Sequence, residues 1–271
     1  MRLLSGDARR AVFAPLDEGV VRSEAVVRRL GSAIALGLIV DGEQLPAEAN
    51  LATSLNVSTM TLRDALADLR ARGLVETRRG RAGGSFVRTR DEALAGLSQV
   101  RLEELGTSEL RELGDVHVAV AGTAARLAAR RASPLEVTRL REIVDRLAGA
   151  TDLTDKRRLD ARYFVELAAC TQSVRLTMAE IDLQTEMGQI PWPAGGSGKR
   201  LRRVVEGHAL VVQAVEERDE DLARSRMEEH LTTRTAWLVD LHLKAATAGD
   251  RRDETGLAPR RRTRGARVAA R

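Results

Sequence analysis

The stretch "LPAEANLATSLNVSTMTLRDALADLRARGLVETRRGRAGGSFV", residues 45–87, decides the fold of the first third of the chain. Leucines recur at three- and four-residue steps on either side of "NVS", which predicts two short amphipathic helices joined by a tight turn. Ser58 is a good N-cap for the second helix, and Gly73 is expected to end it. "LVET" and "SFVR" are typical of two β-strands that flank a glycine-rich turn.

A further helix is expected before this stretch, from Ser23 onward. Its apolar residues share one face of a helix: Val27, Leu30, Ile34 and Leu38. Three helices followed by a hairpin make a winged helix–turn–helix, which binds DNA. We therefore expect a DNA-binding domain over residues 23–88, preceded by a flexible segment over residues 1–22.

The glycine-rich turn admits a second interpretation, a phosphate loop of an enzyme. Such a loop needs a lysine followed by Ser or Thr, with a helix opening directly after it. "GRAGGS" has no lysine, and the β-prone "SFV" follows it. The turn glycines are therefore expected to adopt positive φ and close a hairpin: Gly80, Gly83 and Gly84. The arginines then form a wing aimed at DNA phosphates and the minor groove: Arg78, Arg79 and Arg81.

The second helix of the motif presents polar side chains on its first turn, away from its leucines. Short hydroxyls and helix N-terminal amides approach phosphates closely, and an arginine reaches guanine in the major groove. Alone, the pattern is equally that of an ordinary amphipathic surface helix, but the basic hairpin after it favours DNA binding. The expected DNA contacts are Ser58, Thr59, Thr61 and Arg63.

The charge changes sign along the chain. Residues 1–90 carry 14 Lys and Arg against 10 Asp and Glu, residues 91–244 carry 22 against 26, and residues 245–271 carry 8 against 3. A basic head on an acidic body is typical of a nucleic-acid binder with a separate regulatory part, although +4 over 90 residues is also ordinary. The arginine-rich tail over residues 245–271 has no apolar period, so we expect it to be disordered.

Composition favours helices over sheets in the remainder. Aromatic residues make up 2% of the chain and apolar residues 43%, so the core is built from Leu, Val and Ala. The single cysteine, Cys170, excludes an intrachain disulfide and a cysteine-based zinc site, and fits the cytoplasm. The N-terminus lacks the apolar run of a signal peptide, and the longest nearly apolar run, 11 residues, is too short to span a membrane.

The second half is expected to be an all-α antiparallel bundle over residues 109–244, reached through a linker over residues 89–108. Helical segments are expected at 109–132, 135–149, 155–171, 173–189, 200–217 and 219–243. Between the fourth and fifth, "PWPAGGSG" at residues 191–198 carries two prolines and three glycines, which excludes a helix there.

The head resembles the GntR family of bacterial transcription regulators. Residues 33–87 follow the family pattern "LP.E..LA..L.VS..TLR.AL..L...GLV..RRG.GG.FV" nearly end to end. The resemblance implies that Ser58, Thr59, Thr61 and Arg63 occupy DNA-contacting positions, with Arg79 and Gly80 at the tip of the wing. Many members carry a DNA-contacting arginine after the glutamate of "LP.E"; here that position is Ala49.

The body resembles the FCD effector domain of the FadR-like branch of that family. The matching stretches are "GTAARLAARRA", "DARYFVELAACTQSVRL" and "EGHALVVQAVEERDEDLARSRMEEHL". The resemblance implies six or seven antiparallel helices around a polar pocket, where an Asp and three His often bind a divalent metal that holds a small carboxylate. Asp160, His208 and His230 occupy ligand positions, but Phe164 replaces the fourth ligand, a histidine.

Two interpretations of this pocket stay open. Either Asp160, His208 and His230 hold Zn, Ni or Mn, with water or effector completing the shell, or no metal binds. His117 lies near where relatives often carry an effector-contacting arginine, so it either points into the pocket or is a core-edge histidine bonded to a neighbour. The expected effector contacts are His117, Asp160, His208 and His230.

These features predict a DNA-binding transcriptional regulator without catalytic residues. We expect a homodimeric repressor on a pseudo-palindromic double-stranded DNA operator, with a small carboxylate effector and no membrane partner. A metal-dependent hydrolase built on the Asp/His cluster is the alternative, which the attached DNA-binding head disfavours.

Overall fold

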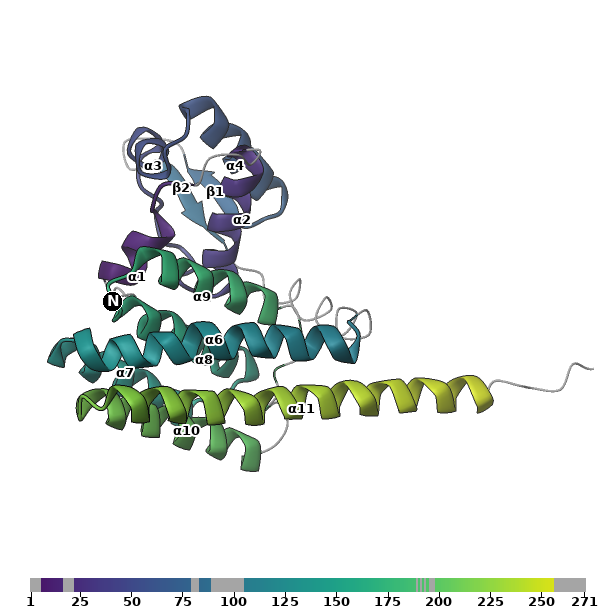
Figure 1. Cartoon of the computed structure of the whole chain (residues 1–271). Helices are drawn as coiled ribbons and strands as arrows, with labels where there is room; N and C mark the ends of the chain where they lie inside the picture. The colour runs from purple at the N-terminus through teal and green to yellow at the C-terminus, as the bar shows by residue number, and fades with distance from the viewer. Residues whose placement is uncertain are drawn as a thin grey trace, which may run out of the picture.

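The computed structural model describes residues 6–16, 22–78, 83–88, 105–188, 190, 192, 194 and 198–255. The architecture is mainly α-helical, with one two-stranded sheet. Figure 1 shows a small domain, the head (residues 22–88), packed against one side of a larger helical body (residues 105–255). This confirms the expected fold class.

The head is a winged helix–turn–helix, as the sequence predicts. Its helices are α2 (Arg22–Ala35), α3 (Glu48–Leu55) and α4 (Thr59–Ala71). Between α3 and α4 the chain reverses through Asn56, which has a left-handed φ of 55°. The Ser58 hydroxyl caps α4 by accepting a hydrogen bond from the Thr61 amide at 3.0 Å. Gly73, with φ 71°, turns the chain after α4 into the wing.

The wing consists of β1 (Val75–Arg78) and β2 (Gly84–Val87), paired antiparallel from Val75↔Val87 to Arg78↔Gly84. Gly84 has φ 149°, and a Cβ there would lie 2.7 Å from the Gln44 amide nitrogen, so the position requires glycine. Gly83 directly follows residues outside the described ranges, so its expected positive φ stays a prediction. The Gln44 side chain donates to the Gly83 carbonyl, which holds this end of the turn. Gly80 lies outside the described residues.

Part of the supposedly flexible N-terminal segment is ordered, which corrects that expectation. Residues Gly6–Val12 form helix α1. Ala8, Ala11 and Val12 are fully buried in the same core as the head. The helix escaped sequence reasoning because two turns are too short to show a period, and because its stability comes from packing rather than from local propensity.

The body contains all six expected helices. They are α6 (Thr107–Arg131), α7 (Pro134–Gly149), α8 (Leu153–Ala169), α9 (Val174–Met187), α10 (Gly198–Glu216) and α11 (Glu220–Thr255). In Figure 1, α11 runs alongside α6 and continues beyond it. The helix thus extends past residue 244 into the segment expected to be disordered, because no proline or helix-ending glycine motif stops it there. Residues 256–271 and 89–104 lie outside the described residues, so most of the expected linker 89–108 is among them, whereas its residues 107 and 108 belong to α6.

Head and body share a hydrophobic core. Val165 of α8 and Ile181 of α9 belong to the same buried cluster as the leucines of α2, α3 and α4. A second cluster fills the body around Tyr163 and Phe164 of α8. Helix α8 therefore lies between the two cores, one face toward the head and the other toward the middle of the bundle.

Candidate functional site

The first turn of α4 carries the side chains expected to contact DNA. Thr59 and Arg63 are exposed, and Thr61 is half-buried. Ser58 is exposed too, but its hydroxyl already lies 2.8 Å from the Thr61 hydroxyl and caps the helix. Its hydrogen can still be donated to a DNA phosphate while its oxygen accepts the capping bond, because a hydroxyl has one donor and two acceptor positions.

Arg63 is held by an ion pair with Glu48 of α3. The distance from Arg63 Nε to Glu48 Oε2 is 2.9 Å, and the two side chains are 65% and 42% exposed. An exposed pair of this kind contributes little to stability, because water competes for both charges. Glu48 therefore pairs with the guanidinium on the recognition surface without fixing its position.

Met60 was missed by sequence reasoning. Its side chain is 67% exposed on the first turn of α4, between Thr59 and Thr61. An apolar side chain in this position suits contact with a thymine methyl group in the major groove. The sequence could have indicated this, because Met60 does not share the helix face that Leu62, Leu66 and Leu69 bury.

Of the three arginines expected in the wing, only Arg78 lies within the described residues. The Arg78 guanidinium lies 4.2 Å from the centre of the Phe86 ring and donates to Glu76 at 2.8 Å. Arg88 also donates to Glu76, and together Arg88 and Arg78 hold the pKa of that carboxyl below its usual value. The Arg78 side chain thus packs against the two-stranded sheet through Phe86 and Glu76. Arg79 and Arg81, like Gly80, lie outside the described residues.

A buried polar cluster occupies the middle of the body, made of Asp160 of α8, Trp192, His208 of α10, and His230 and Arg234 of α11. Arg234 donates to both Asp160 oxygens, at 2.7 and 2.5 Å, and the two side chains are only 6% and 4% exposed. The Trp192 indole donates to the same carboxylate at 2.8 Å, and His208 Nε2 lies 2.8 Å from it. Asp160 is thus the centre on which three other segments converge.

The charges of this cluster balance internally. Burial alone would raise the pKa of Asp160, but Arg234 and His208 outweigh it, and the pKa lies well below its usual value. Burial lowers the pKa of His208 and, more strongly, that of His230, where the neighbouring His208 and Arg234 add to the effect. The resting arrangement is therefore an ionised Asp160–Arg234 pair beside two neutral histidines.

This arrangement does not fit a divalent metal. Within the ranges described, no group of three or more His, Cys, Asp or Glu side chains is placed to hold a metal ion. Both Asp160 oxygens face the Arg234 guanidinium, whose positive charge occupies the place that a cation needs. Phe164, which replaces a ligand histidine, lies with its ring centre 5.2 Å from the His208 ring centre and from the Arg234 guanidinium carbon.

His117 enters the same region from α6, where it is bonded to neighbours, and its expected contact with an effector stays a prediction. It is buried 4.7 Å from the Phe164 ring, between centroids, and it has its own partners. Its Nε2 lies 3.1 Å from a Glu180 oxygen and 3.2 Å from the Gln184 amide nitrogen. Sequence reasoning missed Glu180 and Gln184, because both match an ordinary polar face of α9.

Several buried polar atoms of this region have no partner among the described residues: Glu180 Oε2, His208 Nδ1 and His230 Nε2. A cavity of about 10 Å³ lies between His117 and Arg234, space for about one water molecule. His230 is also packed on the backbone of Gly207, where any Cβ would overlap its ring. Buried polar atoms without partners are costly, and they mark the place where a polar ligand gains hydrogen bonds.

The comparisons with known proteins agree with this architecture. Residues 22–87 match the profile "Bacterial regulatory proteins, gntR family", and residues 112–233 match the FCD domain. The chain is 36% identical to the putative HTH-type transcriptional regulator RmpR of Mycobacterium gastri, over 92% of this chain and 91% of that protein. It is 32% identical to the uncharacterized HTH-type transcriptional regulator Rv0494 of Mycobacterium tuberculosis, over 60% of this chain and 66% of that protein.

Among solved structures, the fold is similar to that of McbR/YncC of E. coli, with a TM-score of 0.51 and 18% identity over 83% of this chain and all of that one. No helix in the described part of the chain is long and apolar enough to cross a membrane. A winged helix–turn–helix that matches one profile and a helical body that matches the other lead to a single conclusion. The chain belongs to the GntR family of bacterial transcription regulators, with an FCD domain as its body.

Proposed function

We propose that this DNA-binding regulator works in the cytoplasm as a homodimeric repressor, and that a small carboxylate bound in its buried polar cluster changes its affinity for the operator. The observation that carries the effector proposal is the Asp160–Arg234 pair. A guanidinium fork matches a carboxylate in two parallel hydrogen bonds. In the resting cluster, Asp160 fills that fork.

An effector carboxylate can take over part of the fork together with a proton, because the single guanidinium charge balances only one of the two carboxylates. Asp160 would keep its bonds from Trp192 and His208, while Arg234 turns to the incoming group. His208 Nδ1 and His230 Nε2 would supply hydrogen bonds for further polar groups of the effector. The proposal therefore uses no metal and assigns no catalytic reaction to the cluster.

Operator binding would use two heads related by two-fold symmetry, because a symmetric dimer reads two half-sites. A ligand shifts operator affinity only through unequal affinity for the DNA-binding and non-binding states. Helix α8 offers the connection, because it carries Asp160 in the cluster and Val165 in the core shared with the head.

The test starts from an operator selected out of random-sequence DNA by the full-length protein. Fluorescence anisotropy then measures operator affinity with acetate, lactate, malonate and citrate, for the wild type, Arg234→Lys and Arg224→Lys. Arg224 is the matched control, since it lies on α11 in an exposed pair with Glu228. We expect a two-fold symmetric site, and at least one carboxylate that weakens binding about tenfold in wild type and Arg224→Lys only.

Two results would overturn parts of this proposal. If no carboxylate changes operator affinity, the effector class is wrong. If the response survives Arg234→Lys unchanged, Arg234 is not the receptor. An asymmetric selected site bound by one chain, checked by sedimentation, would overturn the homodimer.

A further inference from the structure

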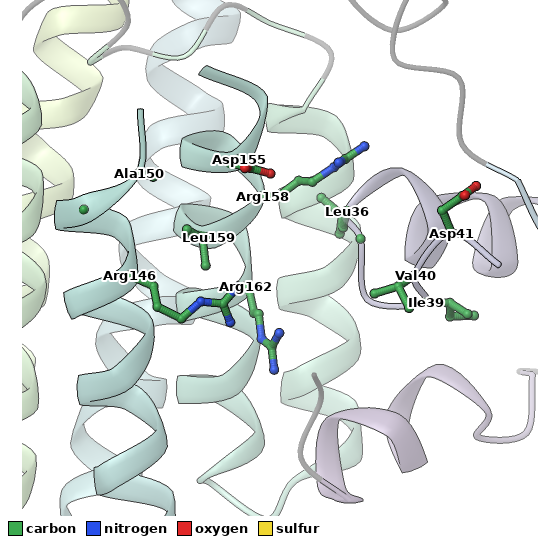
Figure 2. Close-up of a pocket in the computed structure, with 12 residues that line it drawn as sticks. Leu36, Ile39, Val40, Asp41, Arg146, Ala150, Asp155, Arg158, Leu159 and Arg162 are labelled. Atoms are coloured by element: carbon green, nitrogen blue, oxygen red, sulfur yellow. The ribbon is translucent and has the colours of Figure 1, made fainter. Parts of the chain in front are cut away.

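A larger cavity lies at the junction of head and body, away from the buried polar cluster. It encloses about 630 Å³, within the range of small-molecule sites. The head contributes residues 36–41, which follow α2, and the body contributes the end of α7 and the first half of α8 (Figure 2). We call this cavity the junction pocket.

Positive charge predominates in the junction pocket. Arg146, Arg158 and Arg162 line it, against the two carboxylates of Asp41 and Asp155. In Figure 2 the side chain of Arg146 extends toward that of Arg162. Two like charges facing each other in a recess repel, and an anion placed between them removes that repulsion.

The hydrogen-bonding capacity of Arg162 is not used up. Arg162 is 14% exposed, its ion pair with Glu166 spans 3.7 Å, and its buried Nε has no hydrogen-bond partner in the described chain. Burial lowers the pKa of Arg162, Glu166 opposes the shift, and Arg146 adds to it. Arg146 itself is exposed, with no ion pair to a described residue.

The rest of the lining is apolar. Leu36 and Ile39 from the head and Leu159 from α8 are buried side chains that border the cavity. We propose that the junction pocket binds a small organic anion, with a carboxylate or phosphate group held between Arg146 and Arg162 and an apolar part against Leu36 and Leu159. This is a second site, separate from the buried polar cluster.

Such a ligand would act on the contact between head and body. Arg158 already lies against Gly37 of the head, where a Cβ would meet its side chain at 3.4 Å and where φ is 66°. Helix α8 presents Arg158 and Arg162 to the junction and Asp160 to the cluster, so both sites share one rigid element. An anion in the junction pocket would therefore fix the placement of the head that determines operator affinity.

Ligand-observed ¹⁹F NMR with the full-length protein tests the binding directly and without operator DNA. The probes are 4-fluorobenzoate and 4-fluorophenyl phosphate, with 4-fluorobenzyl alcohol as the neutral analogue and inorganic phosphate as competitor. We expect saturable broadening of at least one anionic probe and none of the alcohol. Arg146→Glu and Arg162→Ala should weaken binding about tenfold or more, the loss of one charge-assisted contact. Arg130→Ala, an exposed arginine of α6 outside the pocket, should bind as the wild type does.

Each result decides the proposal. Absence of binding by both anionic probes overturns it, and so does binding that survives Arg146→Glu, an exposed position where folding is not at risk. Binding lost in Arg234→Lys but kept in Arg146→Glu assigns the anion to the buried polar cluster, which overturns this site and supports the proposed function. If inorganic phosphate binds as tightly as 4-fluorophenyl phosphate, the proposed apolar contacts with Leu36 and Leu159 are overturned.

Discussion

Head and body each contain an arginine paired with a carboxylate at similar distance, in opposite surroundings. In the head, Arg63 and Glu48 lie 2.9 Å apart and largely in water. In the body, Arg234 and Asp160 form two hydrogen bonds in the interior. Exposed pairs contribute about 0 to 1 kcal/mol, whereas breaking a buried pair leaves an uncompensated charge that costs several.

Because the two pairs differ in burial, we expect the arginine of each pair to have a different role. Arg63 can leave Glu48 for a guanine or a phosphate at little cost, as a DNA-reading residue requires. Arg234 cannot leave Asp160 unless another anion replaces it, as an effector-responsive site requires. Separate substitutions in each pair therefore test the comparison.

The largest effect is expected from Arg234→Met, which leaves the Asp160 carboxylate buried and unpaired. We expect the free energy of unfolding to fall by about 3–5 kcal/mol, measured by urea denaturation. The double variant Asp160→Asn with Arg234→Met should recover part of that loss, because the stranded charge is gone. Arg224→Ala on the same helix should change the midpoint little. A single variant as stable as the wild type would contradict the buried pair.

A smaller effect is expected for Arg63→Ala, and on DNA binding rather than folding. The operator complex should weaken by about 1–3 kcal/mol and lose discrimination at one base pair, while the unfolding midpoint stays unchanged. Anisotropy with single-base operator variants measures both effects. Equal weakening on every sequence would instead make Arg63 a phosphate contact.

Acid should destabilise the body through its buried histidines. The native pKa of His230 lies below that of the unfolded chain, so the unfolded state binds more protons and stability falls as the pH drops below about 6.5. Between pH 7 and 5 we expect His230 to account for about 1–2 kcal/mol. His230→Gln should flatten that part of the curve. Denaturation at several pH values measures this. If the free energy of unfolding of His230→Gln depends on pH as that of the wild type does, His230 is not the source of the acid sensitivity.

The smallest effect is expected for Glu48→Gln, which frees Arg63. Stability should change by less than about 1 kcal/mol, and operator affinity should stay the same or rise a few-fold, because Arg63 no longer leaves a partner. A large loss of operator affinity would mean that Glu48 positions Arg63 and that the exposed pair matters after all.

The periodicity of the sequence was sufficient to predict the helices and strands of the head and the six helices of the body, because those features depend on local spacing. It could not predict the buried Asp160–Arg234 pair. Arg234 contacts Asp160 across 74 residues of chain, and Trp192 comes from a stretch of sequence with no apolar period. One signal was present, since Arg234 lies one helical turn after the inward His230 and thus on the same face of α11.

The junction pocket was also out of reach of the sequence. Its arginines are spaced as ordinary solvated positions on α7 and α8, and only the docking of residues 36–41 makes them walls of a cavity. Helix α1 could not be predicted for the same reason, because its alanines are buried only through packing against α8 and α9.

We propose that the Arg234 guanidinium occupies the place where the FCD resemblance implies a divalent metal. Elemental analysis of the purified full-length protein for Zn, Ni and Mn, with thermal unfolding before and after chelation, measures whether a metal is bound. The Asp160–Arg234 geometry predicts far less than one metal ion per chain and an unfolding midpoint that the chelator leaves unchanged. One tightly bound ion per chain, with a midpoint that falls on chelation, would contradict the claim.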